Sequence, residues 1–294
     1  MLMEIVHVPV MVKEVLSYFS NLRGVFLDCT VGAGGHSEAI LENIKGSVVI
    51  GIDVDEEILS VAKQRLKKYE SEGRAKLLKA TYVEAQRVLS QLGVKAVNGI
   101  IMDLGVSTLQ LMKGERGFAF SSDGPLDMRM DKTQRLTAYD IVNFWQENQL
   151  RRIFFEYGEE KRYAGRIARF IVKNRPVETT AKLVEVIARA LPEKERRFRR
   201  RHFATRVFQA IRIAVNNELE NLRNFLVQVP DILNQNGRII VISFHSLEDR
   251  IVKEAFRSIQ ELDVLTRKPV RPSLEEVREN PKARSAKMRI AERK

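Results

Sequence analysis

The sequence contains almost no cysteine and little histidine, which narrows the kinds of site it can build. Cys29 is the only cysteine among 294 residues, so an intrachain disulfide and a cysteine-based zinc site are both excluded. A lone cysteine fits a reducing, intracellular compartment, and we expect a cytoplasmic protein. The histidines lie at positions 7, 36, 202 and 245, without the spacing of metal ligands, so we expect no bound metal.

Long hydrophobic runs are also missing. No apolar stretch reaches the roughly 18 residues that a membrane-spanning helix requires, so we expect no association with a membrane. The apolar start, residues 1–12, has neither a basic region nor a small-residue cleavage site. We therefore expect it to belong to the mature protein rather than to a signal peptide.

Acidic residues are fewer than basic ones, and the formal net charge is +12. Such a surplus favours a polyanionic partner, although by itself it is weak evidence for one. The 44% of hydrophobic and 30% of charged residues are ordinary for a globular protein. A chain of this length typically folds into about two domains.

Four short apolar segments in the first third are typical of buried strands. They cover residues 25–29, 47–53, 75–79 and 97–103, and the second and fourth end on the carboxylates Asp53 and Asp103. Apolar residues recur at helical spacing between Ile58 and Tyr69, and Asp55 is suited to cap that helix. Alternating strands and helices predict an α/β fold with a parallel sheet and right-handed crossovers.

The pattern changes after Asp103. Residues 105–135 are rich in Gly, Ser, Asp and Met without a clear period, and residues 137–226 read as helices, with one long apolar stripe over 204–226. A buried strand is predicted again over 237–244, followed by a helix with Ser246 and Asp249 at the spacing of a capping box. A last strand-like segment covers 286–290. The sequence therefore predicts a helical block within an α/β sheet that resumes after it.

Residues 28–36, Asp-Cys-Thr-Val-Gly-Ala-Gly-Gly-His, form a glycine-rich turn before a predicted helix that starts at Ser37. Glycines let a ligand approach the backbone, and the first amides of a helix favour an anionic group. Asp53 follows at about the distance where an acidic residue binds a ribose diol in nucleotide-binding units. A tight turn with a surface aspartate is the alternative without a ligand.

This arrangement serves both dinucleotides and S-adenosylmethionine, and its spacing does not separate them. The turn lacks the third glycine of the dinucleotide pattern because position 37 is Ser, which somewhat disfavours a pyrophosphate. S-adenosylmethionine presents an ammonium and a carboxylate instead. Asp28 is a candidate partner for that ammonium.

Asp103 ends a strand at the sheet edge where ligands bind in open α/β folds. Its carboxylate is suited to bind a cofactor ammonium, to accept a proton from a substrate amine, or only to cap a helix. Tyr82 offers a stacking surface for adenine, with packing in the core as the alternative. Cys29 lies within the strand that leads into the glycine turn, so we predict a small buried residue and no nucleophile.

The segment from Lys194 to Arg206 contains seven Lys or Arg residues with interleaved aromatics. Arginine is suited to bidentate phosphate contacts, and phenylalanine stacks on exposed bases. A solvated charged surface is the alternative. Its place in the helical block of a basic protein favours nucleic acid.

Several motifs in one order resemble the bacterial 16S ribosomal RNA cytosine-N4 methyltransferase family (the RsmH or MraW family). They span nearly the whole chain and lie at residues 28–37, 103–107 with Gln110, 124–131, 201–206 with 208–213, 243–249 and 284–289. One departure is Phe203, where many relatives carry Pro. This departure concerns one loop position and leaves the resemblance intact.

The resemblance implies a class I, Rossmann-like methyltransferase sheet interrupted by an inserted all-helical domain. The expected parts are a first methyltransferase part at 1–110, a substrate-recognition insertion at 111–216, and a second methyltransferase part at 217–294. The implied reaction moves a methyl group from S-adenosyl-L-methionine to N4 of one cytidine in the decoding region of 16S rRNA, in the small ribosomal subunit. The implied cofactor residues are Gly34, Gly35, His36, Asp53, Tyr82, Asp103 and Gln110.

Two residue groups are assigned to the acceptor side. Asp103 and Asp127 are the candidate catalytic residues, with Asp127 as a second candidate proton acceptor in the acceptor loop. Arg199, Arg200, Arg201 and Arg206 are the candidate RNA contacts. The alternatives are a nicotinamide-dependent oxidoreductase, a non-catalytic RNA-binding assembly factor on a methyltransferase fold, and a methyltransferase for DNA or protein.

Overall fold

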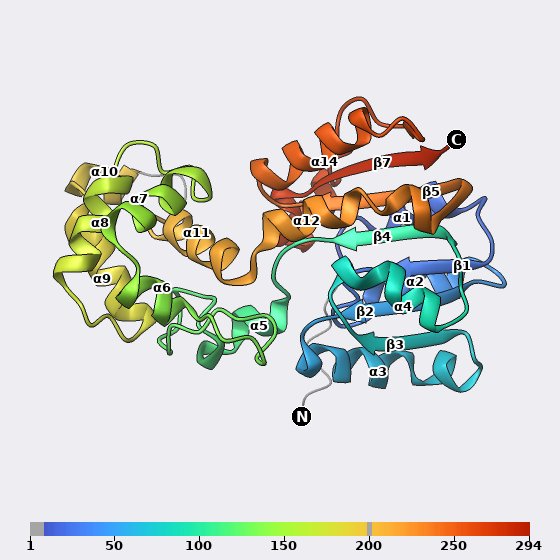
Figure 1. Cartoon of the computed structure of the whole chain (residues 1–294), viewed down its shortest axis with the longest axis horizontal. Helices are drawn as coiled ribbons and strands as arrows, with labels where there is room; N and C mark the ends of the chain where they lie inside the picture. Colours follow the sequence, from blue (N-terminus) through green and yellow to red (C-terminus); the bar gives the residue numbers. More distant parts are fainter. Residues whose placement is uncertain (1–8, 199–201) are drawn as a thin grey trace. The chain divides into compact units, whose positions relative to one another are not determined.

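The computed structural model describes residues 9–198 and 202–294, and the chain divides into two compact units (Figure 1). Unit 1 joins the described residues up to Gly105 with Leu219–Lys294, and unit 2 comprises Val106–Glu218. The chain therefore leaves unit 1 after β4, builds unit 2, and returns to complete the sheet.

Unit 1 is a sheet with helices on both faces. In chain order its elements are α1 (Val12–Phe19), β1 (Val25–Asp28), α2 (Gly35–Asn43), β2 (Val48–Asp53), α3 (Glu56–Ser71), β3 (Ala75–Lys79), η1 (Tyr82–Glu84), α4 (Ala85–Gln91), β4 (Val97–Asp103), α12 (Glu218–Leu226), α13 (Val229–Ile232), β5 (Leu233–Ser243), α14 (Ser246–Ser258), β6 (Leu262–Val264), α15 (Leu274–Glu279), η3 (Pro281–Ser285) and β7 (Lys287–Arg293).

The seven strands have the order β3-β2-β1-β4-β5-β7-β6. Strands β1 to β5 are parallel, and β7 is antiparallel to β5 and β6. The parallel part confirms the predicted α/β fold. The chain builds outward from β1 to β3 and then crosses to β4 on the other side of β1. The carboxyl ends of β1 and β4 therefore flank the topological switch point, where open α/β sheets bind their ligands.

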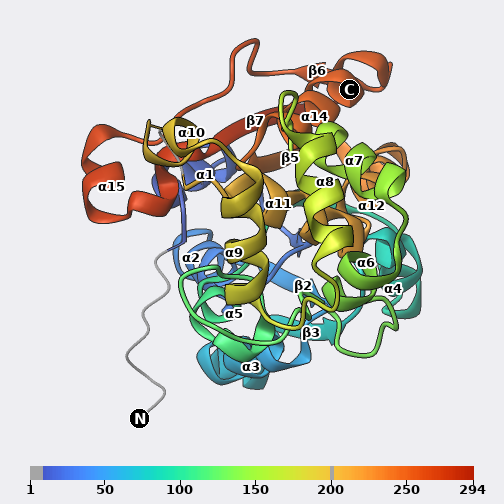
Figure 2. The ribbon, with the colours of Figure 1, turned by 90° about the vertical axis from the view of Figure 1, so that its left-hand side faces the viewer.

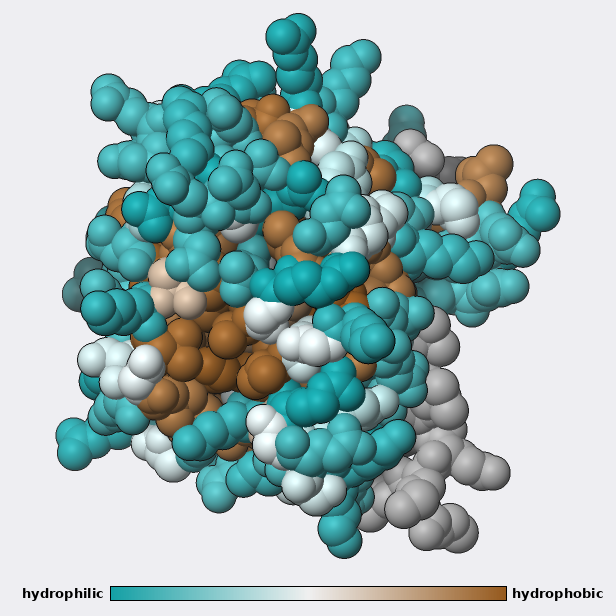
Figure 3. Space-filling view, turned by 90° about the vertical axis from the view of Figure 1, so that its right-hand side faces the viewer, coloured by the Kyte–Doolittle hydropathy of each residue, from teal (hydrophilic) through white to brown (hydrophobic). Residues whose placement is uncertain are grey.

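One face of the sheet is covered by α1, α2 and α3. Buried side chains from these helices, such as Phe19, Ile40 and Leu66, join sheet residues such as Val49 in one apolar cluster. Figure 1 shows α4 and α12 in front of the strands, and Figure 3 shows the surface at the amino ends of β1 and β4, where apolar side chains gather within a polar rim. The carboxyl ends carry the candidate site residues instead.

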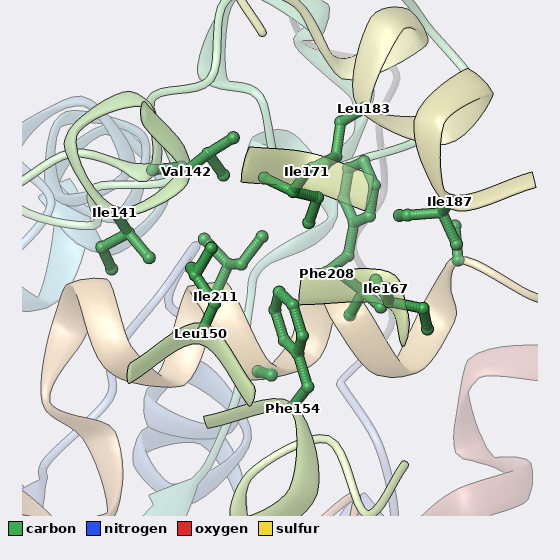
Figure 4. Close-up of a cluster of buried hydrophobic side chains, with 14 of the residues drawn as sticks. Ile141, Val142, Leu150, Phe154, Ile167, Ile171, Leu183, Ile187, Phe208 and Ile211 are labelled. Atoms are coloured by element: carbon green, nitrogen blue, oxygen red, sulfur yellow. The ribbon is translucent and has the colours of Figure 1, made fainter. Parts of the chain in front are cut away.

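Unit 2 is mainly helical. Its elements are α5 (Thr108–Met112), η2 (Gly114–Arg116), α6 (Ala138–Phe144), α7 (Glu147–Glu156), α8 (Ala164–Lys173), α9 (Thr180–Ala190), α10 (Glu193–Phe198) and α11 (Thr205–Asn216). Helix α8 packs between α7 and α9 (Figure 2). Apolar side chains from α6 to α9 and α11 meet in a core of their own, which includes Phe154, Ile167 and Phe208 (Figure 4).

The apolar stripe over 204–226 is buried as predicted, and it is divided between two helices, because Asn217 has φ 50° in the left-handed region and ends α11 before α12 begins. Two local predictions were wrong in detail. Strand β5 begins at Leu233, earlier than the predicted residue 237. The cap of α14 is His245 with Glu248, one residue before the predicted Ser246 with Asp249.

Asp249 forms ion pairs with β7 instead of a cap. Its carboxylate oxygens lie 2.7 Å from Arg289 Nε and 3.3 Å from Lys287 Nζ, both on β7. These pairs join α14 to the antiparallel strand. None of the helices within the described ranges is both long and apolar enough to cross a lipid bilayer.

Candidate active site

The glycine-rich turn after β1 is tied to the ends of two neighbouring strands. The Gly32 amide donates to Asp53 Oδ2 at the end of β2, at 2.9 Å. The Asp103 amide at the end of β4 donates to Thr30 Oγ1 at 2.7 Å. These two bonds hold the turn between β2 and β4, at the switch point of the sheet.

Gly34 and Gly35 are required by this turn. Gly34 has φ +85° and precedes the first residue of α2, a left-handed conformation that side chains rarely adopt. A Cβ atom on Gly35 would lie 2.8 Å from Pro9 Cγ, too close for normal contact. Helix α2 starts at Gly35, two residues before the predicted Ser37, so its first amides follow the turn directly.

His36 and Asp103 face each other at this point. His36 Nε2 lies 3.6 Å from Asp103 Oδ2, with exposed side-chain fractions of 6% and 17%. This separation is an ion-pair distance and is too long for a hydrogen bond. Among the described residues, both His36 nitrogens and Asp103 Oδ1 have no hydrogen-bond partner. Because buried polar groups are almost always paired, these atoms mark a place for the polar groups of a ligand.

The charge state of His36 is set by three carboxylates. Burial disfavours a charged imidazole, but Asp103, and more weakly Asp28 and Glu276, outweigh it and raise the pKa of His36. A donor therefore lies next to an acceptor at the carboxyl edge of the sheet. Such a pair suits a ligand that carries both a carboxylate and an ammonium.

Asp53 is held by backbone amides on both sides. Its Oδ2 accepts from Gly32 and its Oδ1 accepts from the Asp55 amide at 2.9 Å. Burial outweighs these hydrogen bonds and raises the pKa of Asp53 to about 6. The carboxylate is thus held in one orientation at the end of β2, where a ribose diol would be bound.

Asp28 has a different surrounding from the one we expected for an ammonium partner. It is 2% exposed, and it accepts the Ser37 hydroxyl at 2.7 Å and the Thr30 amide at 3.2 Å. Burial raises the pKa of Asp28. Its carboxyl group stabilises the turn, and Asp103 is the more accessible partner for an ammonium.

Tyr82 and Cys29 complete the predicted residues of unit 1. Tyr82 begins η1 three residues after the end of β3, is partly buried, and packs edge-to-face with Phe225 at a ring-centroid distance of 5.7 Å. Cys29 is 2% exposed, and burial raises its thiol pKa well above the ordinary value. The prediction of a small buried cysteine is confirmed.

The remaining predicted residues belong to unit 2. Gln110 is buried in the first turn of α5, where its side chain accepts from the Ser107 amide at 2.9 Å. Asp127 forms an ion pair with Arg129 at 2.8 Å. Arg206 is half-exposed on α11, 3.4 Å from Glu160. Arg199, Arg200 and Arg201 lie outside the described residues.

Burial acts against the anion at Asp127. Hydrogen bonds from Arg129 and the charges of Arg129 and Arg116 outweigh this effect and lower the pKa of Asp127. This carboxylate is a weak proton acceptor near neutral pH.

Sequence reasoning missed the roles of Thr30, Ser37 and Glu276. Thr30 and Ser37 are inside the glycine-rich motif, and a hydroxyl at each end of the turn was the available signal. Glu276 accepts the Met11 amide at 2.6 Å, in addition to its effect on His36. No sequence signal connects Glu276 with the turn, because the two are far apart along the chain.

Three features at the switch point define a cofactor-binding α/β enzyme. They are a glycine-rich turn, an acidic strand end, and a buried His36–Asp103 ion pair whose nitrogens and Oδ1 atom have no hydrogen-bond partner among the described residues. The chain belongs to the MraW methylase family, whose model matches residues 4–294. This membership confirms the predicted class, an S-adenosylmethionine-dependent methyltransferase, over an oxidoreductase.

Relatives of known name match along nearly their full length. "Ribosomal RNA small subunit methyltransferase H" from Thermotoga neapolitana is 57% identical, with 97% of this chain and 95% of that protein covered. The protein of the same name from Kosmotoga olearia is 54% identical, with coverages of 98% and 97%. A solved putative rRNA methylase from Clostridium thermocellum aligns at TM-score 0.48 and 10% identity, over 97% of this chain and 98% of that one.

Proposed function

We propose that this protein methylates the exocyclic N4 of one specific cytidine in the decoding region of 16S rRNA, within the cytoplasmic small ribosomal subunit. The observation that carries the proposal is the buried His36–Asp103 pair at the switch point of the sheet. Both His36 nitrogens and Asp103 Oδ1 have no hydrogen-bond partner among the described residues. The names of the close relatives supply the class of acceptor.

The residues of unit 1 fit S-adenosylmethionine because the unpaired atoms match its charged ends. Asp103 Oδ1 is free to accept from an ammonium, and His36 is placed to donate to a carboxylate. Asp53 accepts the ribose hydroxyls, Gly34 and Gly35 let the backbone approach, and Tyr82 stacks on adenine. Gln110 is a further cofactor contact. When bound, S-adenosylmethionine supplies an electrophilic methyl group on its sulfonium.

The cytosine amine is a weak nucleophile because its lone pair is delocalised into the ring. The protein must therefore align the amine with the methyl group, and positioning supplies much of the rate. A base within a duplex is out of reach, so the cytidine is unstacked into the site. No cysteine nucleophile is needed for transfer to nitrogen, in agreement with the burial of Cys29.

The two catalytic candidates have different roles in this scheme. Asp103 holds the cofactor. Asp127 stays the candidate proton acceptor in the acceptor loop, and its ion pair with Arg129 predicts a weak base. Replacing Asp127 by Asn tests this role, because loss of a base lowers kcat and leaves cofactor affinity unchanged.

The inserted domain at 111–216, between methyltransferase parts at 1–110 and 217–294, supplies the RNA contacts. Arg199, Arg200, Arg201 and Arg206 bind phosphate. Neutralising Arg199, Arg200 and Arg201 weakens RNA binding and lowers its salt dependence. Unchanged affinity and an unchanged salt slope would reject this segment as a contact.

The decisive experiment incubates the protein with labelled S-adenosylmethionine and small subunits that lack the modification, then digests the RNA to nucleosides. Label in N4-methylcytidine establishes reaction, cofactor and acceptor together. Protein-free 16S RNA in a parallel reaction shows whether the assembled subunit is required. The Asp103→Ala variant is the negative control.

Other outcomes favour the alternatives. If subunits are bound and cofactor is bound but no label is transferred, the protein is a non-catalytic assembly factor. If label appears only in DNA or protein supplied in the same reaction, the acceptor is of that class. Either result overturns the proposal.

A further inference from the structure

Helix α8 presents a row of cations on one face. Arg166, Arg169 and Lys173 are spaced by three and four residues, so they lie on the same side of the helix over about 10 Å. All three are exposed, whereas Ile167, Ala168 and Ile171 are buried in the core of unit 2. The row therefore faces solvent, and α8 itself contains no acidic residue.

Two further arginines extend this row. Arg162 is 75% exposed just before α8. Arg151 is an exposed residue of α7, and its Cδ would be 3.6 Å from a Cβ on Gly165. The side chain of Arg151 therefore crosses α8 where the helix has no side chain. These five residues, Arg151, Arg162, Arg166, Arg169 and Lys173, are called the α8 stripe below.

The α8 stripe is only partly neutralised. Arg162 lies 3.2 Å from Glu195, and Arg169 lies 3.5 Å from Glu147. Within the part of the chain that the structure describes, the other three cations have no ion pair. Five cations against two carboxylates leave a local charge of 5 − 2 = +3. Exposed ion pairs are weak, so a phosphate group can replace either carboxylate.

Aromatic rings lie beneath two of the arginines. The Arg162 guanidinium is 5.2 Å from the centre of the Tyr163 ring, and the Arg166 guanidinium is 5.7 Å from that of Phe170. Stacking on a ring holds a planar guanidinium in place, so less freedom is lost when it binds a phosphate.

We propose that the α8 stripe binds backbone phosphates of the RNA substrate, in addition to the contacts proposed for Arg199, Arg200, Arg201 and Arg206. The inference rests on the proposed function, because it takes RNA as the substrate. Arginine-rich, single-sign surfaces recognise phosphates by bidentate hydrogen bonds. A membrane surface is a poorer match, because the apolar residues of α8 are buried or packed against the core and leave no apolar face to insert.

Such a contact recognises the backbone and is independent of base sequence. Each phosphate contact contributes about 0.7 to the slope of log affinity against log salt for single-stranded nucleic acid. Loss of three cations therefore reduces the slope by about 2. Taken from a common value at 1 M salt, affinity at 0.1 M therefore falls roughly 100-fold.

The test compares two triple variants of the full chain. The first carries Arg166→Gln, Arg169→Gln and Lys173→Gln. The second carries Lys63→Gln, Lys67→Gln and Lys76→Gln, which are exposed residues of unit 1 and change the net charge equally. Affinity for protein-free 16S RNA is measured from 50 to 300 mM salt, with cofactor affinity as the check that unit 1 is folded and circular dichroism for the helices of unit 2.

For the first variant, we expect the slope of log affinity against log salt to be smaller by about 2 in magnitude than for the wild type. We also expect a higher KM for RNA and an unchanged kcat. The second variant is expected to resemble the wild type. Equal slopes for the first variant and the wild type would overturn the inference. Weakened binding to intact subunits but not to protein-free RNA would also overturn it, because the partner would then be a protein.

Failure of the proposed function is recognised separately. In that case the wild type forms no N4-methylcytidine on unmodified subunits. Failure of the α8 inference leaves wild-type product formation intact and changes only the comparison of the two triple variants.

Discussion

His36 Nε2 lies 3.6 Å from Asp103 Oδ2, and the two side chains reach this position from different strand ends. His36 is in the first turn of α2, directly after the glycine-rich turn, and Asp103 is the last residue of β4. Their remaining polar atoms have no partner among the described residues. The pair therefore offers a hydrogen-bond donor and an acceptor side by side, which suits a cofactor that carries both a carboxylate and an ammonium.

Replacing Asp103 by Ala is expected to abolish measurable binding of S-adenosylmethionine. The Asp103→Asn variant keeps the shape and removes the charge, so we expect an affinity loss of about 10- to 100-fold, the usual cost of a charged hydrogen bond. Isothermal titration calorimetry measures both. Full affinity in the Ala variant would reject the assigned role.

The same Asn variant reports on His36. Without the Asp103 charge, the pKa of His36 is expected to be lower than in the wild type, and an NMR titration of the imidazole follows it. Because the folded pKa is raised, His36 stabilises the fold below pH 6.5, and this contribution is lost as the pH rises through the folded pKa. The Asp103→Asn variant should lose less stability over this pH range than the wild type. Equal imidazole pKa values in the two proteins would contradict the interaction between His36 and Asp103.

Asp53 predicts a pH dependence of cofactor binding. Its pKa is about 6, so the carboxylate is largely protonated at pH 5 and ionised at pH 7. The Asp53 carboxylate accepts hydrogen bonds from ribose hydroxyls better than the protonated carboxyl group does. We therefore expect affinity for S-adenosylmethionine to increase as the pH rises through 6. Asp53→Asn should bind more weakly and lack this rise.

The stability of the ligand-free protein changes with pH in the opposite direction to cofactor affinity. The pKa of Asp53 is above its ordinary value of 3.8, so the folded state holds its proton longer and stability falls as the pH rises from about 4 to 6. Urea unfolding measures this change. Asp263→Asn, an exposed carboxylate that is 67% accessible, is the matched control and should behave as the wild type. An unchanged profile in Asp53→Asn would argue against the raised pKa.

Gly34→Ala is expected to reduce both stability and cofactor affinity. Gly34 has φ +85°, and a side chain in the left-handed region costs about 1–2 kcal/mol. Gly46→Ala is a matched control, because Gly46 has φ +74° with no atom within 4 Å of its would-be Cβ. Both variants should unfold at lower urea concentration, and only Gly34→Ala should bind cofactor several-fold more weakly. Equal affinities in the two variants would show that the turn tolerates a methyl group.

Cys29→Ala is expected to keep kcat within about twofold, because a 2% exposed thiol with a raised pKa cannot attack a substrate. A stability loss of about 1 kcal/mol is expected from the small change in packing. Single-turnover methyl transfer and urea unfolding measure the two effects. A large loss of transfer with cofactor binding intact would indicate a nucleophilic cysteine after all.

Local patterns determined much of the α/β unit. The strand ends at Asp53 and Asp103, the glycine-rich turn and the buried Cys29 were all predictable, because buried strands are short continuous apolar runs and ligand-binding turns need glycine. The family was predictable as well, from motifs in a fixed order along the chain.

Only the tertiary structure decided how those pieces meet. The order of the strands brings His36 to Asp103, and packing of α15 brings the charge of Glu276 near His36. Asp28 was a candidate ammonium partner in the sequence, but the fold buries it against the Ser37 hydroxyl. Burial, pKa and pairing depend on neighbours that are distant along the chain, and local periodicity carries no information about them.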